Sequence, residues 1–180
     1  MRRLQVALAI LSLVLTTGVS AQTYDGHSFG YTVHFPKGAP PCKGGTSDHG
    51  FGVFLDRGGK DGCSAPKRRQ IIVFTSTIVW TVDKALAEEC DAGGGTIAPA
   101  PDGLRFTGIK SGACRVNLKD GWIRIFVLAQ GGDLPDSRFP NSPSPAHDYV
   151  AWLQTNPQHF ADDLAAFRHT VTTMQIWPLK

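Results

Sequence analysis

Four cysteines constrain the fold of this chain more than any other feature: Cys42, Cys63, Cys90 and Cys114. An even number of cysteines with no CxxC pair is typical of a disulfide framework and argues against a zinc knuckle or a thioredoxin-like site. Three connectivities are possible. We prefer Cys42–Cys63 with Cys90–Cys114, because each bridge joins neighbours along the chain. Each bridge closes a loop of about 20 residues and contributes roughly 3 kcal/mol in the chain-entropy model.

The N-terminal residues predict that the chain is exported. Arg2 and Arg3 precede the apolar stretch LQVALAILSLVL, and small residues follow it up to a plausible cleavage site before Gln22. This layout predicts a secretory signal peptide at 1–21 and a single mature domain at 22–180. An N-terminal membrane anchor is the less favoured alternative, because a span needs about 20 apolar residues. Asn141 precedes Ser-Pro and forms no glycosylation sequon, so we expect a bacterial protein, periplasmic or secreted.

The charge of the mature chain limits the partners that it can have. Removing residues 1–21 lowers the formal net charge from +3 to +1. The densest basic run, Lys67–Arg69, directly precedes an apolar segment, and we interpret it as solvated residues at the start of a strand. Binding to nucleic acid needs clustered excess positive charge, so that class is excluded. We expect the partner to be another protein or a small ligand, with no cofactor and no integral membrane segment after signal cleavage.

Several short segments have the composition of strands and are bounded by turn residues. The first three are expected to form an antiparallel start to one sheet, and the segment at 149–155 is expected to be the last strand. The predicted strands are 29–36, 51–56, 69–77, 104–110 and 149–155, together with the two strands of a hairpin.

The hairpin lies in ACRVNLKDGWIRIFVL, residues 113–128, with Asp120-Gly121 as a two-residue turn. Folding the strands on this turn pairs Cys114 with Val127 and Val116 with Ile125, so that one face is wholly apolar. The pairing places Cys114 on a buried face, where a helix bearing Cys90 can cover it.

Two segments show the periodicity of helices. Residues 81–90 begin with Thr81, which can cap a helix, and end before a run of glycines. Asn156 and Pro157 are typical of a helix start. After them an apolar stripe recurs at spacings of four and three, formed by Phe160, Leu164, Phe167, Val171 and Met174.

The order of these elements resembles a known family. A strand-rich start, a helix and several antiparallel strands precede YVAWLQTNPQHFADDLAAFRHTVTTMQI, residues 149–176. This closing segment resembles that of PsbP-like α+β domains, in which a final strand leads through a short turn into a helix across the sheet. The resemblance covers element order only, and the cysteines and the segment after Leu128 depart from it. It implies a binding or accessory domain.

We therefore predict an α+β fold. A single antiparallel sheet of about six to seven strands carries a mid-chain helix and a C-terminal helix. A loop rich in Pro, Gly and Ser is expected at 129–147, and a loop of this length is a candidate for partner binding.

Candidate catalytic residues are few. Ser47, Asp48 and His49 are adjacent, and three neighbouring side chains cannot easily converge as a triad does, so we interpret them as a turn. A metal or catalytic site assembled from His49 and His147 is the alternative. The acidic pairs Glu88–Glu89 and Asp162–Asp163 are interpreted as solvated helix surfaces.

Three classes of function follow. The favoured one is an exported binding or accessory protein that is not an enzyme, with an inhibitor or immunity protein against a toxin or hydrolase as one version. The second is a periplasmic enzyme with a dispersed histidine site. The third is a structural component of the envelope.

Overall fold

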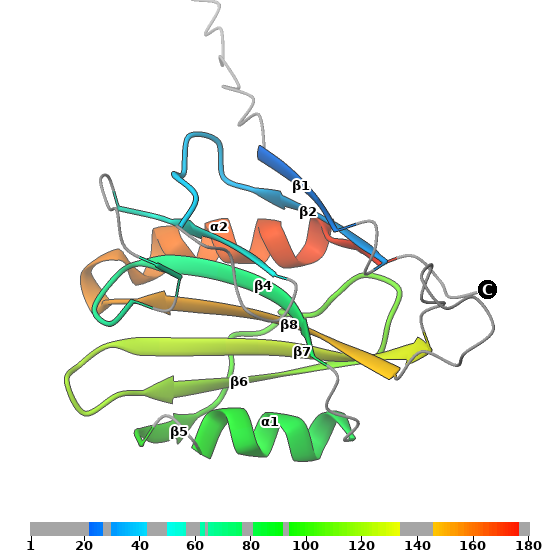
Figure 1. Ribbon diagram of the computed structural model, residues 1–180. Helices are drawn as coiled ribbons and strands as arrows, with labels where there is room; N and C mark the ends of the chain where they lie inside the picture. Colours follow the sequence, from blue (N-terminus) through cyan, green and yellow to red (C-terminus); the bar gives the residue numbers. More distant parts are fainter. Residues whose placement is uncertain are drawn as a thin grey trace, which may run out of the picture.

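The computed structural model describes residues 22–26, 30–42, 50–56, 62–63, 65–76, 81–91, 94–133 and 146–176 (Figure 1). The elements in chain order are β1 (Gln22–Gly26), β2 (Tyr31–Phe35), β3 (Phe51–Phe54), β4 (Gln70–Ser76), α1 (Val82–Asp91), β5 (Thr96–Ala98), β6 (Ser111–Asn117), β7 (Ile123–Asp133), β8 (Ala146–Thr155), the 3₁₀ turn η2 (Pro157–His159), α2 (Phe160–Thr173) and β9 (Gln175–Ile176).

The described chain is mostly β, with two antiparallel sheets. Six strands form the larger sheet in the order β3-β4-β8-β7-β6-β5, and three form the smaller one in the order β1-β2-β9. The prediction of an α+β fold with a single sheet is therefore wrong. The expected three-stranded start is divided between the sheets, because β2 pairs with β1 and β9 whereas β3 pairs with β4.

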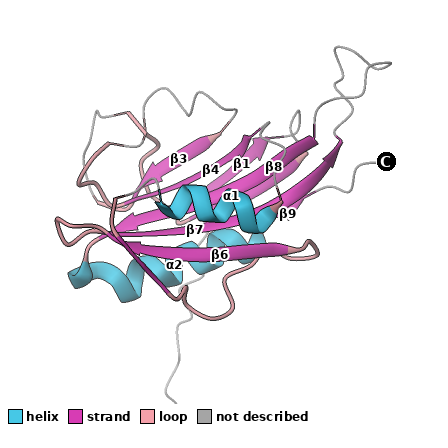
Figure 2. Cartoon of the chain, turned by 90° about the horizontal axis from the view of Figure 1, so that it is seen from below, coloured by secondary structure: helices cyan, strands magenta, loops and turns pink. Residues whose placement is uncertain are grey.

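The centre of the larger sheet is buried on both faces. Helix α1 lies on one face and α2 on the other, as Figure 2 shows. The apolar cluster on the α2 side also includes Tyr31, Val33 and Phe35 of β2, so the smaller sheet covers that face together with α2. The central strands β7 and β8 consequently carry apolar side chains in both directions rather than in alternation.

The register of the β6–β7 hairpin differs from the prediction by one residue. Cys114 pairs with Phe126 and Val116 with Arg124. The loop holds three residues rather than two, because the N–H of Leu118 donates to the carbonyl of Trp122 at 2.8 Å. Gly121 supplies the positive φ, 85°, that such a loop needs. Pairing apolar residues across the hairpin did not predict its register, because both faces of β7 are buried and both carry apolar side chains. The expected placement of Cys114 on the side covered by α1 is confirmed.

Two predicted segments have different boundaries in the structure. Residues 104–110 form no strand, although Leu104 and Phe106 are buried in the core. The N–H of Phe106 donates to Ser111 Oγ instead of to a neighbouring strand, and Gly108 turns the chain with a φ of 78°. The loop predicted at 129–147 is shorter, since β7 continues to Asp133 and β8 begins at Ala146. Residues 134–145 lie outside the described part of the chain.

Both predicted helices are present, and Thr81 caps α1 as predicted, whereas Asn156 caps the turn η2 that leads into α2 rather than α2 itself. The hydroxyl of Thr81 accepts from the N–H of Lys84 at 3.4 Å, and the side chain of Asn156 accepts from the N–H of His159. The apolar stripe of α2 packs into the core, with Phe167, Val171 and Met174 fully buried. The strand β9 follows α2, so β8 is not the last strand.

A buried ion pair joins the start of α2 to the larger sheet. Arg69 Nε donates to Asp163 Oδ2 at 2.8 Å, and the hydroxyl of Thr155 donates to the same carboxylate. The side chain of Asp163 is 3% exposed, so its charge depends on these partners. The interpretation of Asp162–Asp163 as a solvated pair is thus wrong for Asp163.

Replacing Asp163 with alanine will leave the partly buried Arg69 charge and the Thr155 hydroxyl without their partner. We expect Asp163→Ala to lower the free energy of unfolding by about 3–5 kcal/mol, measured by urea denaturation. The matched control is Asp162→Ala, an exposed neighbour that should change stability by about 0.5 kcal/mol or less. Equal effects of the two substitutions would contradict a role for the buried pair.

Candidate functional site

Both disulfides lie on the side of the larger sheet that α1 covers. They join Cys42 to Cys63 and Cys90 to Cys114, with Cα–Cα distances of 5.0 and 6.5 Å. These are the two pairs that we prefer from the sequence. Cys63, Cys90 and Cys114 all pack against one apolar cluster around Trp152. The bridges therefore tie a loop and a helix onto the same face.

Gly52 of β3 allows the first disulfide to lie against the sheet. A Cβ placed on Gly52 would lie 2.6 Å from Cys42 Sγ and 2.9 Å from Ile72 Cγ1. Any larger residue at this position would displace the bridge. The absence of a side chain at position 52 thus sets how closely the disulfide approaches β4.

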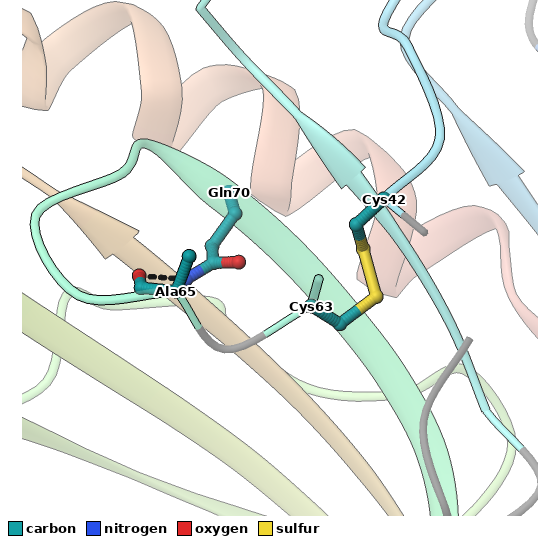
Figure 3. The surroundings of a disulfide bond; sticks show 4 residues. All are labelled: Cys42, Cys63, Ala65 and Gln70. Carbon is teal, nitrogen blue, oxygen red and sulfur yellow. Dashed lines mark hydrogen bonds between the residues drawn. A yellow bond between two sulfur atoms is a disulfide. The ribbon is translucent and has the colours of Figure 1, made fainter. Parts of the chain in front are cut away.

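The disulfide leads directly into a turn, residues 65–69, which we call the braced turn. Gln70 Nε2 and Gln154 Nε2 both donate to the carbonyl of Ala65, at 3.0 and 3.1 Å. Gln154 Nε2 also lies 2.9 Å from the carbonyl of Arg68. Figure 3 shows the bridge between Cys42 and Cys63 beside the contact of Gln70 with Ala65.

The two glutamines that hold the braced turn are themselves fixed. Gln70 is 0% exposed and Gln154 is 1% exposed, and Arg124 Nε donates to Gln154 Oε1 at 3.0 Å. Breaking a hydrogen bond of a buried amide costs about 1–3 kcal/mol, because the group cannot turn to water instead. The turn is therefore held by buried contacts from two neighbouring strands.

Lys67, at the tip of the braced turn, has an unusual backbone conformation. Its φ is 54°, the one positive φ of a residue other than glycine in the described part of the chain. A side chain in this left-handed region costs about 1 kcal/mol, which glycine avoids. Pro66 and Lys67 are both exposed. Such an outlier persists where surrounding contacts hold the backbone in place, as they do here.

The two arginines beside Lys67 are occupied in ion pairs. Arg68 Nε and Nη2 contact the Asp56 carboxylate at 3.0 and 2.9 Å, and the guanidinium lies over the ring of Phe54. Arg69 contacts Asp163, as described above. The interpretation of the whole run as solvated is wrong, since only Lys67 of the three is exposed.

Next to the braced turn, Arg124 stands over an aromatic pair. Its guanidinium lies 5.5 Å from the ring centroid of Trp152, which stacks on Phe126. Burial raises the pKa of the nearby Glu89 carboxyl, and the charge of Glu88 raises it further, whereas Arg124 lowers it. Arg124 thus adds a positive charge beside the braced turn. The half-buried Glu89 carboxyl is near enough to Arg124 to interact with it electrostatically.

The buried carboxyl group of Asp148 lies at the other end of the sheet face that α1 covers. Asp148 is 2% exposed and pairs across the sheet with Ser76 and Gln130, beside an irregularity in the β7–β8 ladder. Burial raises the pKa of its carboxyl to about 6. This residue carried no signal in the sequence, because an aspartate that opens an apolar strand has the pattern of a turn residue.

The candidate catalytic residues are not brought together in the described structure. Ser47, Asp48 and His49 lie outside the described residues, and His147 is described only by its backbone in β8. Of the acidic pairs, Glu88 and Asp162 are exposed as predicted, whereas Glu89 is half-buried. Among the described residues, no group of three histidine, cysteine, aspartate or glutamate side chains is placed to hold a metal ion.

No protein-family model matches this chain, and a search of curated proteins found no significant match. Within the described residues, no helix combines the length and apolar character needed to cross a membrane.

The arrangement around residues 65–69 is suited to recognition. It presents one exposed cation, Lys67, on a fixed backbone, next to the guanidinium of Arg124 over Trp152, and arginine and tryptophan are enriched where proteins bind one another. A rigid, preformed turn also loses little conformational entropy on binding. The sequence contained one signal for this site, the basic run after Cys63, but no pattern identified its glutamine contacts.

The raised pKa of Asp148 predicts how stability depends on pH. The folded state holds the proton more tightly than the unfolded chain, so Asp148 favours folding below pH 4, and that contribution is lost as the pH rises through about 6. Relative to Asp148→Asn, the native protein should lose up to about 3 kcal/mol of stability between pH 4 and 7. Urea denaturation across this range measures it, and parallel pH profiles of the two proteins would show that the prediction is wrong.

Proposed function

We propose that this chain is an exported binding protein of a bacterial envelope, periplasmic or secreted, that recognises another protein through the braced turn. The observation that carries the proposal is the number of independent restraints on five residues without regular structure. The Cys42–Cys63 bridge, two buried glutamine amides and two arginine ion pairs all act on residues 65–69 or directly beside them.

The restraints exceed what a simple connection between strands needs. A connecting loop on a protein surface is normally free to vary, whereas a loop positioned by a rigid scaffold is a common place for a binding site. Here the loop is held in a conformation that its own residue at position 67 disfavours. This combination supports recognition by a preformed surface.

Two disulfides are compatible with an extracytoplasmic location, because such bonds persist in oxidising compartments. The signal peptide at 1–21 lies outside the described residues and remains a prediction. The resemblance to PsbP-like domains also remains a prediction. The order of β8, a short turn and α2 agrees with it, and an accessory binding role is what it implies.

An inhibitor or immunity protein is the second candidate. The exposed tip at Pro66 and Lys67 favours it, because an inhibitor needs a rigid protrusion that enters the partner's cleft without rearranging. The enzyme class, with a site at His49 and His147, predicts an activity that is lost when either histidine is replaced.

The proposal is tested by crosslinking the full chain to its partner in the cells that produce it. We expect one stoichiometric protein partner in the envelope fraction. Replacing Cys42 and Cys63 together by serine removes the covalent restraint beside the braced turn and should lower the yield of the complex.

The matched control replaces Cys90 and Cys114 by serine, which loosens α1 but leaves the turn tied to β3. This variant should retain most of the complex. If the native chain repeatedly captures no partner under mild conditions, the proposed function is wrong.

A further inference from the structure

We infer that Lys67 is the side chain that enters the partner, and that it is received by a pocket lined with carboxylates on a protein. This inference rests on the proposed function and specifies the chemistry of the partner. It follows from the charges, the exposure and the backbone of the braced turn.

Lys67 is the exposed positive charge of the basic run. Arg68 and Arg69 each contact a carboxylate, from Asp56 and Asp163, whereas Lys67 has no ion-pair or hydrogen-bond partner in the described part of the chain. The tip therefore presents a single ammonium group, and the guanidinium of Arg124 is linked to the braced turn through Gln154. The partner surface that complements this tip therefore carries negative charge.

The backbone at Lys67 indicates that a lysine is needed there. Glycine or asparagine would adopt a φ of 54° with less strain. Among the described residues, no hydrogen bond or ion pair of Lys67 compensates for this strain. Strained positions of this kind are frequent where a residue is presented to a ligand.

The geometry favours a protein over a phosphate group or a membrane. Recognition of phosphate typically combines several cations or backbone N–H groups directed at one point, and anionic membranes attract clusters of four or more basic residues. Here one long, flexible side chain is exposed next to an exposed proline. A lysine of this kind acts as a point charge that can reach into a recess.

A carbodiimide that couples amines to carboxylates in direct contact tests the inference on the full chain, in the envelope fraction of the cells that produce it. We expect an amide bond between Lys67 Nζ and an aspartate or glutamate of one protein, located by mass spectrometry. Lys37, which is also exposed at a turn, is the matched control and should form no such bond.

Four variants separate the effect of charge from that of folding. Lys67→Glu should lower the yield of the complex at least tenfold, Lys67→Arg should retain half or more, and Lys37→Glu should leave it unchanged. Lys67→Gly removes the strain and should raise the melting temperature, yet it should also lower the yield at least tenfold.

The outcomes distinguish this inference from the proposed function. A native yield of complex with Lys67→Glu, or equal coupling at Lys37 and Lys67, overturns the role of Lys67 while the binding function stands. Coupling to lipid alone, with binding to vesicles that contain phosphatidylserine, overturns the protein partner. Capture of no partner by the native chain overturns both proposals.

Discussion

Burial of both faces of β7 and β8 is the constraint on which the rest of this structure depends. The two strands form the centre of the larger sheet, with α1 on one side and α2 with the smaller sheet on the other. The described side chains at 125–129 and 148–155 are buried, so they must pack against apolar groups or find a polar partner inside the protein. Burial on both faces explains the apolar runs in their sequences as well as the places where polar residues interrupt them.

The polar residues of these central strands are the ones that fix the surrounding elements. Thr155 contacts Asp163 and so positions the start of α2, whereas Gln154 contacts the carbonyl groups of residues 65 and 68 and so positions the braced turn. Neighbouring residues of one strand thus hold elements on opposite faces, because successive side chains point in opposite directions. The braced turn is rigid because its carbonyl groups accept the hydrogen bonds that the buried side-chain amide of Gln154 donates. The disulfide adds a covalent restraint beside it.

Much of the local structure could be predicted from the sequence, but the pairing of strands could not. The caps at Thr81 and Asn156 and the stripe on α2 depend on short-range chemistry, and each is present. The register of β6 with β7 failed because a strand that is apolar on both faces gives no preference for either. β1 and β9 were missed because QTYDG and QI are too short and too polar to show periodicity.

The candidate site was even less accessible from the sequence. Its cysteines and basic run are visible, yet Gln154 lies 89 positions beyond Ala65, and no local pattern connects the two. Asp163 looked like one of two solvated carboxylates, and only the fold distinguishes it from Asp162. Buried polar contacts between distant residues depend on strand order, which was the part of the fold that the sequence predicted least well.

The central claim is that residues 65–69 form a rigid, preformed turn. Backbone ¹⁵N relaxation of the mature protein measures this most directly. We predict order parameters at Lys67 and Arg68 near 0.85, the value of rigid backbone, equal to those of β4. Values below about 0.6 at these residues, typical of a flexible loop, would contradict a braced turn.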